Sequence, residues 1–157
     1  MTRTASWSEP EAQAIIDRHL GREGPLLPIL HDIQAAFGHV PRAAIPVIAS
    51  ALNLSRAEVY GVVTFYHDFR DAPHGRHVLK LCRAEACQSM GGEALAAQVE
   101  AALGIAFGET TADGRVTLEP VYCLGLCATA PSAMVDGRIH GRMTAEKVEA
   151  LLAEVGA

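Results

Sequence analysis

The sequence lacks the features that bind nucleic acid or anchor a chain in a membrane. Its formal net charge is −5 and it contains no basic cluster, so the positive surface that attracts nucleic acid is not expected. No uncharged apolar run approaches the roughly 18 residues that a membrane-spanning helix requires. Residues 1–10 have no apolar stretch of the kind found in signal peptides. We therefore expect a soluble, cytoplasmic protein with no nucleic-acid partner and no membrane partner.

Motifs of substrate chemistry are missing as well. The chain has no GxGxxG dinucleotide pattern, no GxxxxGK phosphate loop and no GxSxG nucleophile pattern. No pair of carboxylates is arranged for acid–base catalysis, and the seven histidines include no HxxxH pair. We expect no catalytic residue on this chain.

Four cysteines are present, and they form two doublets. Cys82 and Cys87 are spaced C-x4-C, whereas Cys123 and Cys127 are spaced C-x3-C, and each doublet follows a β-like run. Two cysteines beyond the end of a strand can direct both sulfurs toward one point, and two such loops can form a four-thiolate site. Because thiolates select zinc, Cu(I) or iron–sulfur over magnesium and calcium, the sequence predicts one such centre with these four ligands.

Other roles for the cysteines compete with a metal centre. In a reducing cytosol, paired cysteines are more often ligands or redox groups than structural disulfides. A catalytic dithiol usually has C-x-x-C spacing, which neither doublet has. Structural zinc suits the same ligands, and its doublets commonly have spacings of two to four residues. Spacing alone therefore leaves iron–sulfur and zinc open.

The residues beside the cysteines favour an iron–sulfur centre. Such a cluster with four thiolates is negatively charged, and it needs hydrogen-bond donors near its sulfurs. Gly125 and the alanines of both loops let backbone N–H groups approach. Arg83 directly follows the first cysteine, where it either offsets the charge of the cluster or is an exposed loop arginine.

Residues 8–70 are predicted to form a small helical unit. Ser8 and Ser55 each precede a glutamate by three residues, which is the capping-box pattern that begins a helix. Apolar residues at helical spacing and the Gly and Pro breaks define the remaining bounds. The predicted helices cover residues 8–20, 25–37, 42–52 and 55–66.

The pattern changes at residues 71–75, a short breaker that contains proline and glycine. Beyond it the predicted order is β-α-β-β-α, with strands at residues 77–81, 116–122, 131–135 and 138–140 and helices at 91–103 and after Thr144. The first two strands flank a helix and should be parallel, whereas Asp136-Gly137 predicts an antiparallel hairpin. This is the minimal thioredoxin-like plan. The expected fold class is α+β, with a helical domain at residues 1–72 and a thioredoxin-like α/β domain at 73–157 that holds a mixed four-stranded sheet.

Two strings in the sequence are highly specific, EVYGVVTFY at residues 58–66 and CLGLC at residues 123–127. Together with residues 27–41 and Ala130-Pro131, they resemble almost end to end the thioredoxin-like [2Fe–2S] ferredoxins, the 24-kDa-type subunit family of respiratory complex I. The resemblance implies that one [2Fe–2S] cluster is bound. Its implied ligands are Cys82, Cys87, Cys123 and Cys127.

Within this family the chain looks most like the gamma subunit of soluble NAD-dependent formate dehydrogenases, because Leu126 stands where complex I members more often have alanine. The resemblance implies an electron-transfer subunit beside an FMN- and NADH-binding diaphorase partner. A separate catalytic subunit would oxidise formate to CO₂ at a molybdenum or tungsten cofactor, and NAD⁺ would be reduced to NADH. The equivalent subunit of complex I or of an NAD-linked hydrogenase is the alternative, and a structural-zinc adaptor is the alternative from another class. Whether the isolated chain forms a homodimer is left open.

Overall fold

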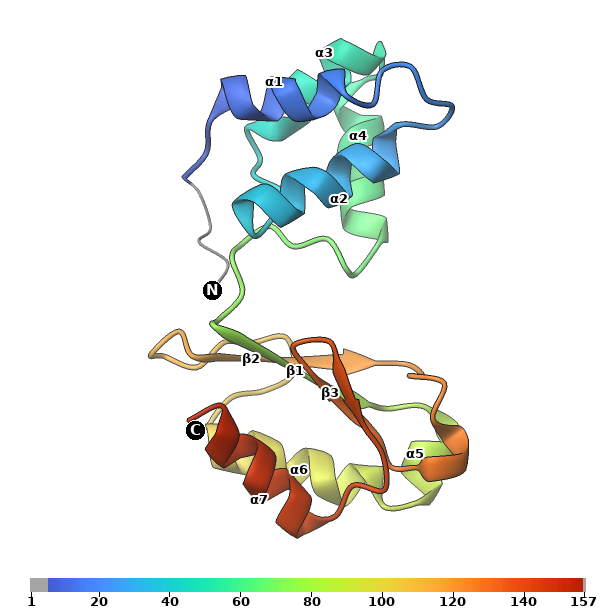
Figure 1. Cartoon of the computed structure of the whole chain (residues 1–157), viewed down its shortest axis with the longest axis vertical. Helices are drawn as coiled ribbons and strands as arrows, with labels where there is room; N and C mark the ends of the chain where they lie inside the picture. Colours follow the sequence, from blue (N-terminus) through green and yellow to red (C-terminus); the bar gives the residue numbers. More distant parts are fainter. Residues whose placement is uncertain (1–5, 157) are drawn as a thin grey trace. The chain divides into compact units, whose positions relative to one another are not determined.

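The computed structural model describes residues 6–156, which belong to two compact units. The first unit reaches Pro73 and the second begins at His74 (Figure 1). Residues 1–5 and 157, which the predicted domains include, lie outside the described part of the chain. The assignment of residues 1–72 and 73–157 as separate domains stays a prediction.

The first unit is helical. Its helices are α1 (Glu9–Asp17), α2 (Leu26–Phe37), α3 (Ala44–Leu52) and α4 (Arg56–Phe65). At α4 the Ser55 hydroxyl accepts the Glu58 amide while the Glu58 carboxylate accepts the Ser55 amide, so the predicted capping box is present. Ser8 caps α1 by accepting the Glu11 amide at 3.4 Å. Short polar caps and amphipathic faces thus explain where these helices begin and what they bury.

Apolar faces of these helices meet in a core. The large side chains that are fully buried in the unit include Ile16, Ile29, Leu30, Ile33, Phe37, Ile48 and Val59. Trp7, the single tryptophan of the chain, packs on the ring of Phe37 with centroids 5.3 Å apart. The predicted helices match the observed ones except near their ends, since α1 ends at Asp17 and α3 begins at Ala44.

The second unit contains a mixed sheet in the order β2-β1-β3-β4. Its strands are β1 (His77–Cys82), β2 (Val116–Val121), β3 (Ala133–Val135) and β4 (Arg138–His140). β1 pairs parallel with β2, and β3 pairs antiparallel with β4, both as predicted. β1 also pairs antiparallel with β3, a pairing that the sequence did not predict. Asp136 and Gly137 both have positive φ, 49° and 83°, which is the backbone that a type I′ hairpin turn requires. The predicted α+β fold class is confirmed.

Helices of the second unit are α5 (Glu85–Ser89), α6 (Gly92–Leu103) and α7 (Ala145–Glu154). Figure 1 shows α6 and α7 on the same face of the sheet. The core between them contains Leu79, Val99, Val116, Leu118, Val135 and Val148. The sequence does not predict the short α5, because five residues are too few to show a helical period. Among residues 6–156, no helix is both long and apolar enough to cross a bilayer.

Truncation of a buried side chain in the helical core should destabilise the first unit. Ile33 is fully buried in α2, and Ile33→Ala should lower the free energy of unfolding by about 2–5 kcal/mol. Leu20 is exposed, and Leu20→Ala should change it by less than about 0.5 kcal/mol. Urea unfolding followed by Trp7 fluorescence measures both, and equal losses in the two variants would contradict the assigned core.

The Asp136 carboxylate holds the hairpin turn against β1. It accepts the Val78 amide at 2.9 Å and pairs with Nδ1 of His77 at 2.7 Å. Burial raises the pKa of Asp136, but the bonds from His77 and Val78 outweigh it and hold the pKa below the usual 3.8. Ionised Asp136 therefore stabilises the folded state above pH 3.8, and this contribution is lost as pH falls through the folded-state pKa.

Asp136→Asn should reveal this dependence. At neutral pH the substitution should lower the free energy of unfolding by less than about 1 kcal/mol, as is typical of partly exposed ion pairs. The cost should shrink as the pH is lowered below the folded-state pKa of Asp136, because the wild-type carboxyl is then protonated. Urea unfolding of both proteins at a series of pH values measures this cost. A difference in the free energy of unfolding that does not change with pH would contradict the stabilising role of ionised Asp136.

Candidate metal centre

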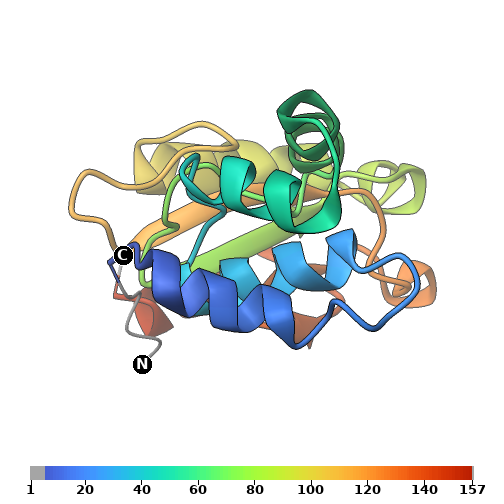
Figure 2. The same cartoon turned by 90° about the horizontal axis from the view of Figure 1, so that it is seen from above.

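The cysteines lie where β1 and β2 end. Cys82 is the last residue of β1, and its register partner in β2 is Val121. Cys123 follows two residues after that partner, so the parallel pairing brings the starts of the two cysteine loops side by side. Figure 2 shows α5 and the segment around residue 127 at the same end of this unit.

The first doublet is buried. Cys82 is 5% exposed and Cys87, which lies in α5, is 2% exposed. The hydroxyl oxygen of Ser132 lies 3.5 Å from Sγ of Cys87. This half of the site is therefore enclosed by protein atoms rather than by solvent.

The second doublet is exposed. Sγ of Cys123 and Sγ of Cys127 are 3.7 Å apart, and the Gly125 amide donates to Sγ of Cys123 at 3.3 Å. Cys123 and Gly125 have positive φ, 122° and 75°. Glycine adopts such a conformation without strain, whereas a cysteine does so rarely. The loop is thus bent tightly enough to direct two sulfurs to one side.

Backbone amides connect the two loops through the Cys82 sulfur. Burial raises the pKa of the Cys82 thiol, but hydrogen bonds outweigh it and hold the pKa below its usual value. The donors are the Ala84 amide of the same loop and the Leu124 amide of the other loop, with the side chains of Cys87 and Ser132 adding to them. The site therefore favours a thiolate at Cys82.

The four thiols lie within electrostatic reach of one another. The hydrogen bond to Cys123 and the charge of that thiolate raise the pKa of Cys127, and burial and the charges of Cys87 and Cys82 raise it further. Over residues 6–156, no three His, Cys, Asp or Glu side chains share the geometry of a single metal ion. The structure thus brings the predicted ligands together as two pairs.

The spacing within a pair suits one tetrahedral metal. With metal–sulfur bonds of about 2.3 Å, two thiolates on a tetrahedral ion lie about 3.8 Å apart. The observed 3.7 Å between the Cys123 and Cys127 sulfurs agrees with that value. A centre with two metals, each held by two thiolates, needs two such pairs, and the Cys123–Cys127 pair has the required spacing.

The structure excludes one of the two interpretations of Arg83, that of an exposed loop arginine. Its guanidinium donates to the Glu93 carboxylate at 2.8 Å and lies 4.8 Å from the ring centroid of Phe107. Its side chain is only 22% exposed, so it is not a free loop arginine. Since its charge is paired with Glu93, Arg83 attaches the first cysteine loop to α6.

Comparison with known proteins identifies the type of centre. Residues 12–156 match the family described as thioredoxin-like [2Fe-2S] ferredoxin. The chain belongs to this family. The predicted cofactor, one [2Fe–2S] cluster, is thereby confirmed, and the family is one of electron carriers.

Similar proteins include members of two kinds of complex. The chain is 42% identical over 120 residues to a subunit of NADH-quinone oxidoreductase from Pseudomonas aeruginosa, covering 76% of this chain and 72% of that one. It is 35% identical over 133 residues to the HndA subunit of the NADP-reducing hydrogenase from Solidesulfovibrio fructosivorans, covering 85% and 78%. A crystal structure of NAD⁺-reducing [NiFe]-hydrogenase in the H₂-reduced state matches with a TM-score of 0.71 and 28% identity. That match covers 83% of this chain but only 22% of the longer hydrogenase polypeptide.

The residues of the site fit the ferredoxin cluster. Four free thiols provide an all-sulfur ligand set, which suits iron–sulfur chemistry. A backbone N–H group already donates to a sulfur, from Gly125 to Cys123 at 3.3 Å. Such donors offset the negative charge of a cluster and adjust its reduction potential.

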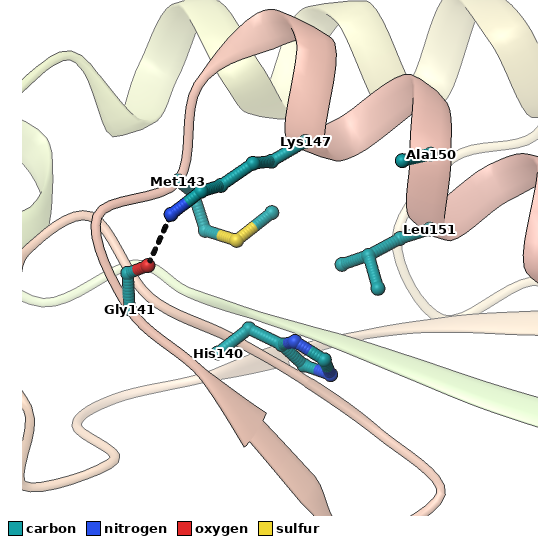
Figure 3. Close-up of a pocket in the computed structure, with 6 residues that line it drawn as sticks. All are labelled: His140, Gly141, Met143, Lys147, Ala150 and Leu151. Atoms are coloured by element: carbon teal, nitrogen blue, oxygen red, sulfur yellow. Dashed lines mark hydrogen bonds between the residues drawn. The ribbon is translucent and has the colours of Figure 1, made fainter.

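A pocket of about 300 Å³ lies between β4 and α7 (Figure 3). Lys147 lines it and donates to the carbonyls of Gly141 at 3.2 Å and Arg142 at 2.9 Å. The Arg142 amide in turn donates to the Thr129 carbonyl at 2.6 Å. The pocket wall thus supports the second cysteine loop, and no cysteine lines it.

Some contributors to the site carry no sequence signal. Ser132, the Leu124 amide and the Glu93 partner of Arg83 act through contacts between segments distant in the chain. The sequence shows Gly92 as the second glycine of a pair. The requirement for glycine at this position comes from a tertiary contact, which the sequence does not show. A Cβ at Gly92 would lie 2.6 Å from the carbonyl oxygen of Cys87.

Gly92→Ala should therefore disturb the first cysteine loop. The added methyl group must displace the backbone of Cys87, at a cost of about 1–3 kcal/mol in the free energy of unfolding, and we expect less iron and sulfide per chain. Gly61→Ala is the matched control, because a Cβ there has no atom within 4 Å and helical alanine is favoured over glycine. Metal analysis and urea unfolding measure both, and full cluster content with unchanged stability in Gly92→Ala would contradict the steric argument.

Proposed function

We propose that this chain is the [2Fe–2S] electron-transfer subunit of an NAD-linked oxidoreductase complex. The cluster ligands are Cys82, Cys87, Cys123 and Cys127. The observation that carries this proposal is the arrangement of these thiols as two pairs, a buried one and an exposed one whose sulfurs are 3.7 Å apart. The names of the relatives, a subunit of NADH-quinone oxidoreductase and one of NADP-reducing hydrogenase, support the parent class.

The chain's own residues hold, orient and partly enclose the cluster. The bound cluster supplies the chemistry of taking up and releasing one electron. Cys82 and Cys87 hold the buried side, where water is excluded. Cys123 and Cys127 hold the exposed side, which a partner's redox centre can approach. Electron exchange of this kind needs rigid ligands and close approach, and the sheet and loops provide both.

The finer proposal is the gamma subunit of an NAD-dependent formate dehydrogenase. Leu126 in the second cysteine loop supports it, because complex I members of the family more often have alanine there. The proposed partners are an FMN- and NADH-binding diaphorase subunit and, through the complex, a catalytic subunit with a molybdenum or tungsten cofactor. The whole assembly would convert formate and NAD⁺ to CO₂ and NADH, and a cytoplasmic location is part of the proposal.

The equivalent subunit of complex I or of an NAD-linked hydrogenase is the second candidate. Its support comes from the relatives named above, a subunit of NADH-quinone oxidoreductase and an NAD⁺-reducing hydrogenase of similar structure. The two candidates share the cluster and differ in their partners. Capture of the chain under native conditions separates them, because only the first predicts formate-dependent NAD⁺ reduction in the captured complex.

Electron paramagnetic resonance of anaerobically purified protein tests the cluster itself. The oxidised protein should be silent, and reduction with dithionite should give an S = ½ signal, with about two irons and two sulfides per chain. Cys123→Ser should abolish or destabilise the cluster. Zinc in place of iron with no signal would remove electron transfer from the function, and full cluster content in Cys123→Ser would overturn the ligand assignment.

A further inference from the structure

Ser132 lies at the buried half of the cysteine site. It is 3% exposed and directly precedes β3. Its Oγ is 3.5 Å from Sγ of Cys87. Its backbone carbonyl accepts the Cys82 amide at 3.0 Å. One buried residue thus touches both cysteines of the first doublet.

The direction of this hydrogen bond follows from the chemistry of the ligands. A thiolate bound to iron has no proton to donate, so it can only accept. The Ser132 hydroxyl must then be the donor. A cluster that gains an electron becomes more negative, and a donor beside its sulfurs stabilises the reduced form more than the oxidised form.

We propose that Ser132 is a positioning residue that donates an O–H···S hydrogen bond to the buried Cys87 ligand and raises the reduction potential of the cluster. This inference rests on the ligand assignment proposed above. It adds a side-chain donor, at a residue outside both doublets, that sets the potential of this chain's electron carrier.

Burial explains why Ser132 should matter more than a surface donor. Cys123 and Cys127 are exposed, so water can replace a protein donor lost from their side. Cys82 and Cys87 are enclosed, and a donor lost there leaves the sulfur without a replacement. The effect of removing the Ser132 hydroxyl should therefore appear in the potential.

Four variants of the full-length protein test the proposal. Ser132→Ala removes the hydroxyl, while Ser132→Thr and Ser132→Val have nearly the same shape and differ in whether a hydroxyl is present. Ser89→Ala is the control, because the Ser89 hydroxyl donates to the Ala86 carbonyl on the exposed surface of α5. The potential is measured by redox titration of the electron paramagnetic resonance signal, together with iron and sulfide content.

The potential of Ser132→Thr and of Ser89→Ala should equal that of the wild type. In Ser132→Ala and Ser132→Val, the equilibrium constant for one-electron reduction should fall about three- to tenfold, which is about 30–60 mV at 59 mV per decade. Pulsed electron paramagnetic resonance in D₂O should also show one fewer exchangeable proton coupled to the reduced cluster in these two variants. If the valine variant loses its cluster while the threonine variant keeps it, the requirement for a hydroxyl is likewise supported.

Wild-type potentials in fully loaded Ser132→Ala and Ser132→Val would overturn the proposal and leave the electron-transfer function intact. A shift of the reduction potential in Ser89→Ala as large as that in Ser132→Ala would overturn it as well. Loss of the cluster from both the threonine and the valine variant, with normal content and potential in the alanine variant, would show that only side-chain volume matters at this position. Absence of iron and sulfide from the wild type would instead refute the function on which the inference rests.

Discussion

The parallel pairing of β1 with β2 determines how far apart the two cysteine loops are. Cys82 lies opposite Val121, and a slip of one residue would turn every side chain of β2 to the other face of the sheet. Val116 and Leu118 would then leave the core in which they are fully buried. The apolar face that stabilises the sheet is therefore the same feature that sets the distance between the first and second cysteine doublets.

Hydrogen bonding at the site is unequal between its two halves. Protein groups, among them the Ala84 and Leu124 amides, reach the Cys82 sulfur, whereas the exposed Cys123 and Cys127 are open to solvent. A negatively charged cluster in a wholly apolar enclosure would be costly unless its charge met donors. The enclosed half depends on donors from the protein because no water reaches it, whereas at the open half water can supplement the Gly125 amide.

Local signals in the sequence predicted much of this fold. The capping box of Ser55 and Glu58, the Asp136-Gly137 turn and both cysteine doublets depend on residues close together in the chain, and each is present in the structure. Ser132 depends on a contact across 45 residues, so no pattern marks it. The α5 helix was not predicted for another reason, because five residues are too few to show a helical period.

Residues that select a parent complex should differ from those that hold the cluster. Every member of the family needs its thiolates and their donors, so these cannot distinguish one partner from another. Selection has to come from side chains that neither the core nor the cluster uses. Tyr122 and Met90 flank the two cysteine loops and are 75% and 62% exposed. Large apolar side chains exposed beside a redox centre gain from burial against a partner.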